Sequence, residues 1–283
     1  MDTQSFFPQR PDAVPTIYAY RLVGVESHKG YLKVGYTDRD VETRVKEQSS
    51  QMRVPYEIVL RESAMSNDGS CFTDHDVHAL LKKQGCLQLN AGEDKNEWFK
   101  CTAKDVMAAI VALQTGTANI EKRTQTFDMR PEQERAVKMT LDYFRQQKID
   151  EPDRTPKFLW NAKMRFGKTF ASYQLAKRMG FKRILILTFK PAVESAWRDD
   201  LVSHVDFEGW QFISNKDAKN NSLNIDQEYA HADKSKPIVV FGSFQDMLGT
   251  GDGGGIKAKN EFIHTVSWDL VIFDEYHFGA WRE

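Results

Sequence analysis

Three continuous apolar runs in the second half of the sequence constrain the fold most. They are RILILTF (183–189), PIVVFGS (237–243) and DLVIFDE (269–275), and segments with helical patterns separate them. A strand that is apolar at every position is typical of a parallel sheet that helices cover on both faces. The sequence therefore predicts an α/β domain built on a parallel sheet.

A fourth apolar run, KFLWNA (157–162), is predicted to be a strand that leads into the loop Ala162-x4-Gly167-Lys168-Thr169. This is a Walker A pattern with alanine in place of the first glycine. In such a loop, backbone N–H groups at the start of the following helix bind phosphate oxygens. A lysine then faces the β- and γ-phosphates, and a threonine hydroxyl binds Mg²⁺. The loop predicts a site for ATP and Mg²⁺.

The run 269–275 supports this prediction because it ends in two carboxylates, Asp274 and Glu275. Ligands of open α/β sheets bind at the carboxyl ends of the strands. We expect Asp274 to hold Mg²⁺ and Glu275 to polarise the attacking water. Taken alone, two acidic residues at the end of a strand could be a coincidence, but their position downstream of the phosphate loop favours the functional interpretation.

Several motifs follow one another in a characteristic order. They are MRPEQERAV (129–137), MRFGKT (164–169), TFKPAVESAWRDDL (188–201), FGSFQDM (241–247) and DEYH (274–277). Residues 128–283 resemble superfamily 2 helicases with a DEAD/DEAH-type motif, in the branch that includes restriction-enzyme translocases. The resemblance implies a first RecA-like P-loop NTPase lobe over 130–283 and ATP-driven movement along nucleic acid. It also implies an adenine contact for Gln133, whose alternative is a solvated helix glutamine.

The first 120 residues follow a different pattern. Strands are expected at 16–23, 30–36, 56–60 and 97–101, and helices at 40–48, 73–85 and 102–116. The alternation of short β-rich runs with helices predicts a small α+β domain over 16–120. Residues 1–15 are polar and interrupted by proline, so we expect a flexible arm, and the polar stretch 121–129 is predicted to be a linker.

The α+β domain carries TIYAYRLV (16–23), GYLKVGYTDRDVETRVKEQ (30–48) and NEWF (96–99). These segments resemble the GIY-YIG nucleases of the phage-type branch. Tyr18 stands in the GIY position after Thr16, which replaces the first glycine, and Lys33 precedes Val34-Gly35 where YIG stands. The resemblance implies metal-dependent phosphodiester cleavage, with Tyr18, Lys33 and Arg44 as catalytic residues. Tyrosine can position or deprotonate water, and cationic side chains offset charge on the phosphate.

The acidic metal ligand of this domain is less obvious. We favour Asp74, which precedes His78 with the spacing that the resemblance implies, and Glu97 is the reserve candidate for a Mg²⁺ or Mn²⁺ site. Each candidate has a structural alternative: strand aromatics could pack a sheet face, Arg44 could be solvated, and Asp74 could start a helix. His75 and His78 could also bind zinc, but no second ligand pair has a suitable spacing.

The composition limits partners and location only weakly. The formal net charge is -1, with 39 Lys and Arg against 40 Asp and Glu, so there is no overall basic field. A local basic groove remains compatible with that total, and DNA is the expected partner ahead of RNA. The three cysteines indicate free thiols, and no signal-like or membrane-spanning segment is present in the sequence. We therefore predict a cytoplasmic protein.

Two other functions stay open at this stage. The α+β domain could bind DNA without cutting it, or the chain could be an RNA helicase with an RNA-binding appendage. Nothing in the sequence matches the second RecA-like lobe, which carries the arginine fingers in the resembling helicases. We therefore expect that lobe in a C-terminal part beyond this chain, and expect the chain alone to hydrolyse ATP poorly.

Overall fold

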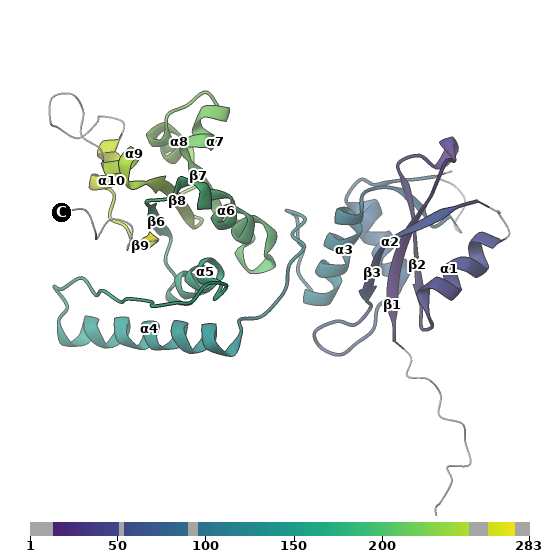
Figure 1. The fold of residues 1–283 in the computed structure, drawn as a ribbon, viewed down its shortest axis with the longest axis horizontal. Coiled ribbons are helices and arrows are strands. Elements are labelled where there is room, and N and C mark those ends of the chain that lie inside the picture. Colours follow the sequence, from purple (N-terminus) through teal and green to yellow (C-terminus); the bar gives the residue numbers. More distant parts are fainter. Residues whose placement is uncertain (1–13, 51–53, 90–95, 249–259, 275–283) are drawn as a thin grey trace, which may run out of the picture. The chain divides into compact units, whose positions relative to one another are not determined.

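A computed structural model describes residues 14–50, 54–89, 96–248 and 260–274 of the 283-residue chain. The chain divides into two compact units, Met1–Gln125 and Thr126–Glu283 (Figure 1). The predicted arm of residues 1–15 lies almost wholly outside the described residues.

The first unit is an antiparallel sheet with helices. Its elements are β1 (Thr16–Leu22), the 3-10 helix η1 (Glu26–His28), β2 (Tyr31–Thr37), α1 (Val41–Ser50), β3 (Tyr56–Ser63), α2 (Asp74–Lys83), β4 (Leu87–Gln88), β5 (Trp98–Lys100) and α3 (Ala103–Thr115). The strand order is β3-β1-β2-β5-β4. The predicted α+β class is confirmed, and the two-residue β4 is an addition that no periodicity indicated.

Strand β1 is buried on both faces, which positions its tyrosines. Ile17 and Ala19 belong to an apolar cluster that includes residues of α2 and α3. Tyr18 and Tyr20 belong to a second cluster, in which Val41 and other residues of α1 take part. Because successive side chains of a strand point to opposite faces, α1 covers the tyrosine face and α2 with α3 cover the other. Alternate residues of TIYAYRL therefore pack into two apolar clusters, one on each face of the sheet.

The predicted linker of residues 121–129 is packed rather than free. Arg123 is only 2% exposed, and the Asn119 side chain donates a hydrogen bond to the Ala108 carbonyl in α3 (2.9 Å). Four residues after Arg123, the ring of Phe127 packs within the second unit, with its centroid 4.7 Å from that of Phe170. The boundary between the units, at Gln125, thus falls inside a segment that is anchored on both sides.

Asp105 fastens the start of this segment to α3 and predicts a pH effect. Its carboxylate accepts hydrogen bonds from the Thr102 backbone N–H (2.9 Å) and from Lys122 Nζ (2.6 Å). Burial raises the pKa of Asp105, but these hydrogen bonds outweigh it and lower the pKa to about 2. Because the pKa is lower in the folded protein, the ionised carboxylate stabilises the fold at pH values above its ordinary pKa of 3.8. This stabilisation is lost as the pH falls through about 2.

We expect Asp105→Asn to lower the free energy of unfolding of the chain by about 1–2 kcal/mol at pH 7. The difference from wild type should shrink as the pH falls from about 4 to 2, because the wild-type carboxylate then becomes protonated. Urea unfolding across this pH range measures it. An equal difference at pH 2 and pH 7 would contradict the assignment.

The second unit is built on a parallel sheet. Its elements are α4 (Pro131–Asp150), α5 (Lys168–Met179), β6 (Arg183–Thr188), the 3-10 helix η2 (Pro191–Val193), α6 (Glu194–Ser203), the 3-10 helix η3 (Val205–Phe207), β7 (Gln211–Ser214), α7 (Asn215–Asn220), α8 (Ile225–His231), β8 (Ile238–Ser243), α9 (Phe244–Leu248), α10 (Glu261–Thr265) and β9 (Leu270–Asp274). The strand order is β7-β8-β6-β9, with parallel pairing throughout.

Helices cover both faces of this sheet, as the apolar runs predicted. In β6, Ile184 and Ile186 pack with residues of α5 and α6. Leu185 and Leu187 pack on the other face with residues of α7 to α10. The continuous apolar run of β6 is thus explained by burial on two sides. Helix α4 lies outside this layer and packs against α5.

The predicted strand at 157–162 is wrong. This segment has no regular secondary structure, pairs with none of the described strands, and runs back along α4 (Figure 1). Trp160 Nε1 donates a hydrogen bond to Thr140 Oγ1 (2.7 Å), and the rings of Phe158 and Tyr143 lie 5.5 Å apart. Both partners belong to α4, so Phe158 and Trp160 contact that helix instead of a neighbouring strand, while Leu159 is exposed.

The strand register brings three strand ends to one edge of the sheet. Thr188 at the end of β6 is aligned with Ser243 of β8 and with Asp274 of β9. This is the carboxyl edge at which the sequence predicted a ligand site.

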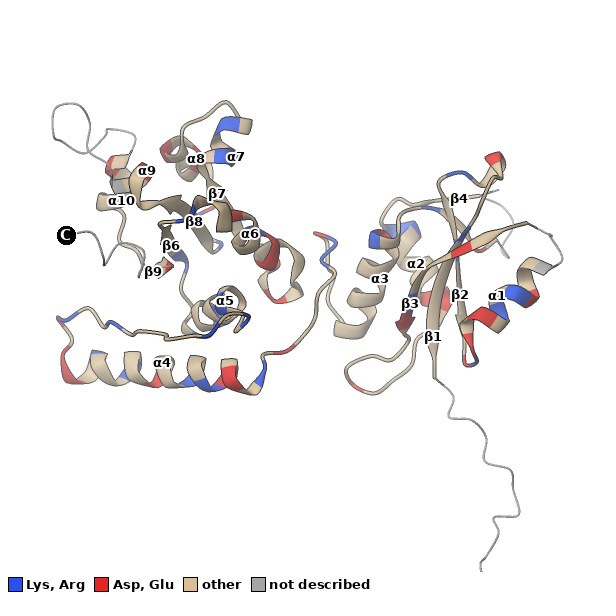
Figure 2. Ribbon diagram, viewed as in Figure 1, with Lys and Arg blue, Asp and Glu red and all other residues tan. Residues whose placement is uncertain are grey.

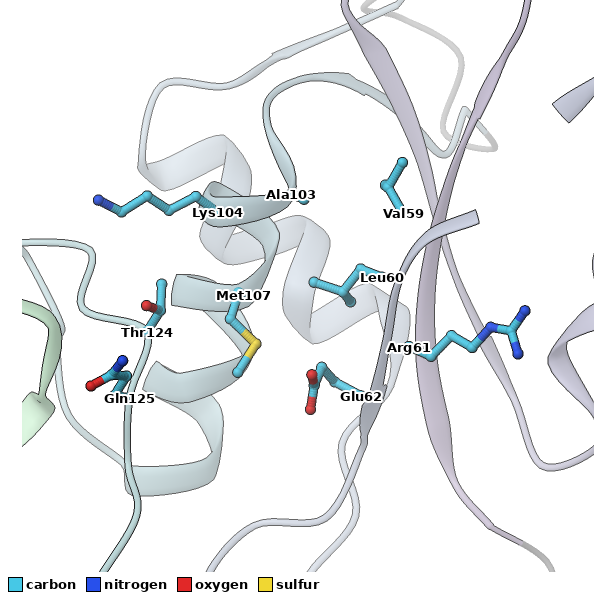
Figure 3. A pocket seen from close by; sticks show the side chains of 9 residues that line it. All are labelled: Val59, Leu60, Arg61, Glu62, Ala103, Lys104, Met107, Thr124 and Gln125. Atoms are coloured by element: carbon cyan, nitrogen blue, oxygen red, sulfur yellow. The ribbon is translucent and has the colours of Figure 1, made fainter. Parts of the chain in front are cut away.

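The surface charges are mixed along the helices of both units. Lys and Arg alternate with Asp and Glu along α1 and α4 (Figure 2). Among the described residues, no helix is long and apolar enough to cross a membrane.

Candidate functional site

The loop before α5 meets the end of β9 at the carboxyl edge. Lys168 Nζ lies 3.5 Å from Asp274 Oδ1, and the two side chains are 39% and 10% exposed. Thr169 is the second residue of α5 and is half-buried. The lysine of the predicted phosphate loop and the carboxylate at the end of β9, which are far apart in the sequence, thus lie side by side. Glu275, the predicted water-polarising residue, lies outside the described residues.

The start of α4 holds the phosphate loop by its carbonyl groups. Gln133 Nε2 donates to the carbonyl oxygens of Phe166 (2.8 Å) and Gly167 (3.2 Å). Arg130 Nη2 donates to the Arg165 carbonyl (2.8 Å). Gly167 has a φ of +77°, and a Cβ there would lie 2.5 Å from Gln133 Nε2. The backbone conformation therefore favours glycine, and a side chain here would also have to displace the Gln133 amide from the loop.

Gln133 is buried, and its amide group is used within the chain. Its Oε1 accepts the Arg130 backbone N–H (2.8 Å), while its two N–H groups face the loop carbonyls. The structure therefore assigns Gln133 to holding the loop. The adenine contact stays a prediction, and it would require the amide to release one of these hydrogen bonds.

The absence of the first Walker A glycine has a local explanation. Ala162 is not among the residues with positive φ, whereas Arg165 (φ +63°) and Gly167 are. The left-handed turns of this loop thus come after Ala162, where alanine meets no backbone restriction. A non-glycine residue in the left-handed region costs about 1–2 kcal/mol, and such strain occurs preferentially at functional sites.

In the first unit, Tyr18 lies at the centre of a second cluster. The side chain is 1% exposed, and its phenol donates to Gln48 Oε1 in α1 (3.2 Å). Gly35 lies opposite Tyr18 on β2, and a Cβ there would lie 2.5 Å from the phenol oxygen. Glycine is required here by close approach. Sequence reasoning missed Gln48, although its spacing from Arg44 places both on one face of α1.

Charged groups surround this tyrosine. Burial raises the pKa of the Tyr18 phenol, the charge of Arg44 acts against that rise, and the carboxylate of Glu97 adds to it. Lys33 Nζ lies 3.2 Å from Glu97 Oε2. Arg44 also lies 3.9 Å from Glu47, on the next turn of α1. Tyr18, Lys33, Arg44 and the reserve acid Glu97 therefore share one region.

The favoured acid, Asp74, is the first residue of α2 and lies one helical turn before His78. Burial lowers the pKa of His78, and the carboxylates of Asp74 and Glu97 both oppose that shift. His78 Nε2 donates to the Val34 carbonyl (2.8 Å), because a carbonyl can only accept. Its Nδ1 then carries the lone pair.

The zinc alternative gains no third ligand from the part of the chain that the structure describes. The rings of His75 and His78 lie 6.2 Å apart. Over the described ranges, no group of three or more His, Cys, Asp or Glu gathers around a metal position.

Comparison with known families places the second unit. Residues 126–281, more than half of the chain, match the family of the type III restriction enzyme res subunit. The chain belongs to this family. Membership implies the RecA-like P-loop fold, in agreement with the parallel sheet and with the loop that precedes α5. In this res-subunit homologue, the loop and Asp274 occupy the helicase-like domain.

Residues 16–114 match the T5orf172 domain, so the chain joins that domain to the helicase-like one. A curated relative is the C-terminus of a putative type II restriction enzyme and methyltransferase of Mycoplasma pneumoniae. It is 34% identical over 166 residues, which are 56% of this chain and 21% of the relative. The chain thus spans about a fifth of that relative's length. No solved structure matches this chain.

Proposed function

We propose that this chain combines a metal-dependent DNA endonuclease of the GIY-YIG kind with the nucleotide-binding lobe of an ATP-driven DNA translocase, in a restriction system. The observation that carries the proposal is the meeting of Gly167, Lys168 and Asp274 at one sheet edge, in a chain whose first unit contains the Tyr18 cluster. The family match and the restriction-enzyme relative support the same function. DNA is the proposed partner because both kinds of domain act on it.

The residues of the second unit fit a magnesium nucleotide. The start of α5 presents backbone N–H groups to phosphate oxygens, and Lys168 adds a positive charge. The Thr169 hydroxyl and the buried Asp274 carboxylate are oxygen donors of the kind that Mg²⁺ prefers. When bound, Mg²⁺ would neutralise charge on the phosphates. Lys168 would then leave Asp274 and contact the phosphates of the nucleotide. Glu275 would orient the attacking water. A second RecA-like lobe would complete the site.

The residues of the first unit fit phosphodiester cleavage. The Tyr18 phenol donates a hydrogen bond to Gln48, so its oxygen lone pairs can accept a hydrogen bond from a water molecule and orient it. Lys33 and Arg44 would offset the negative charge that grows on the phosphate. A divalent metal, when bound by an acidic residue, would polarise the phosphate.

We retain Asp74 as the proposed metal ligand. Glu97 is already engaged by Lys33, whereas no lysine or arginine within the described ranges pairs with Asp74. A metal ion competes less well for a carboxylate that a cation already neutralises. Asp74→Asn should therefore abolish cleavage, while Glu97→Gln should retain metal-dependent activity, because Lys33 remains to bind phosphate.

Plasmid nicking over a Mn²⁺ titration separates these two candidates. If Glu97→Gln is inactive and Asp74→Asn is active, Glu97 is the metal ligand instead of Asp74.

The function itself is tested on the full protein with supercoiled plasmid and with ATP. We expect nicking that requires Mg²⁺ or Mn²⁺ and stops with EDTA, and ATP hydrolysis that duplex DNA stimulates more than RNA. Binding of DNA without nicking in either metal would favour a non-cleaving module. Stimulation by RNA alone would favour an RNA helicase.

A further inference from the structure

Trp197 of α6 connects three elements of the nucleotide site. Its indole Nε1 donates to Asp274 Oδ2 at the end of β9 (3.0 Å). Its backbone carbonyl accepts a hydrogen bond from the Tyr173 hydroxyl of α5 (2.9 Å). The two rings pack edge to face, with centroids 5.4 Å apart. One side chain, 2% exposed, thus touches both the helix of the phosphate loop and the carboxylate opposite it.

Asp274 needs such a partner because its carboxylate is largely withdrawn from water. Of the described residues, Lys168 and Trp197 approach its two oxygens, at 3.5 Å from Oδ1 and 3.0 Å from Oδ2. A buried carboxylate without hydrogen-bond donors is costly. An indole N–H can only donate, and the packed ring cannot rotate, so this bond sets the direction of the carboxylate.

Trp197 is the partner that remains with Asp274 when a nucleotide binds. If Lys168 turns to the phosphates of a bound nucleotide, one oxygen of Asp274 loses its cation. The Trp197 bond then continues to hold Oδ2, which leaves Oδ1 directed at the space that Lys168 has left.

We propose that Trp197 is a positioning residue that aims Asp274 Oδ1 at the divalent cation of a bound magnesium nucleotide. This inference rests on the proposed nucleotide site. Trp197 also packs in the apolar cluster with Phe170 and Leu201, so a purely structural role predicts a loss of stability alone. The positioning role predicts a selective loss of the metal's contribution to nucleotide binding.

The test uses the full protein and a fluorescent non-hydrolysable ATP analogue, with binding followed by polarisation over a Mg²⁺ titration. In Trp197→Phe, the Mg²⁺ concentration for half-maximal enhancement of binding should rise about 10-fold, the size expected for one hydrogen bond to a charged group. Affinity in EDTA should stay within about 2-fold of wild type, since the phosphate contacts of Lys168 remain.

Tyr173→Phe is the matched control. It removes the hydrogen bond to the Trp197 carbonyl from the same cluster but leaves the indole N–H in place. Its Mg²⁺ midpoint should match wild type. An unchanged midpoint in Trp197→Phe, or an equal shift in Tyr173→Phe, would overturn the inference.

A second variant covers the case in which Trp197→Phe does not fold. Replacing Trp197 by its benzothiophene analogue keeps the ring shape and exchanges the N–H for sulfur, so the fold is retained. The same 10-fold shift is expected, and an unchanged Mg²⁺ midpoint would overturn the inference. If wild-type protein fails to bind the analogue at all, the proposed nucleotide site fails instead, which distinguishes the two failures.

Discussion

Lys168→Ala should reduce the affinity of the full protein for ATP by about 10- to 100-fold, the range for losing one charge-assisted contact. The lysine lies in the first turn of α5, beside the loop that Gln133 and Arg130 hold in place. The loop contacts come from the backbone and from α4, so the fold should survive the substitution. Isothermal titration with a non-hydrolysable ATP analogue measures the loss.

Lys177→Ala is the matched control for that experiment. Lys177 belongs to the same helix but pairs with Asp206 (2.7 Å), away from the phosphate loop. Its affinity for ATP should equal that of wild type. Equal affinities for wild type and Lys168→Ala would remove the nucleotide site from the second unit.

Tyr18→Phe should lower metal-dependent DNA cleavage by about 10²–10⁴-fold while the protein stays folded. The ring keeps its place in the apolar cluster with Val41 and Val45, and only the hydroxyl that bonds to Gln48 is lost. Gly35→Ala should have a comparable effect, although Tyr18 itself is not substituted. Its new Cβ would lie 2.5 Å from the phenol oxygen and must displace it. Plasmid nicking measures both variants.

Tyr20→Phe controls for the loss of a buried hydroxyl. The Tyr20 ring is stacked beside Tyr18, with centroids 6.4 Å apart, and its buried hydroxyl has no hydrogen-bond partner among the residues that the structure describes. Removing that hydroxyl should leave cleavage unchanged and raise stability slightly, because an unsatisfied polar group is eliminated. If Tyr20→Phe is as inactive as Tyr18→Phe, or if Gly35→Ala cleaves normally, the hydroxyl of Tyr18 has no special role.

Periodicity predicted those elements whose side chains repeat regularly. The apolar runs at β6 and β8 were placed correctly because burial on both faces demands an apolar residue at every position. The run at β9 was also placed correctly, although Val271 and Phe273 are exposed. The run at 157–162 looks the same locally, yet Trp160 and Phe158 pack on α4. A short apolar run therefore does not by itself specify a strand, because the packing partner of each side chain is decided elsewhere in the chain.

The functional site also combines features that local sequence specifies with contacts that only the packed structure specifies. The sequence by itself determined the phosphate loop and the carboxylate at the end of β9, because residue type and spacing act locally. Only the tertiary structure decided that Trp197 holds Asp274, that Gln133 holds Gly167, and that Gly35 makes room for a phenol. These contacts join distant segments, and their geometry depends on how whole helices and strands pack, which no local pattern records.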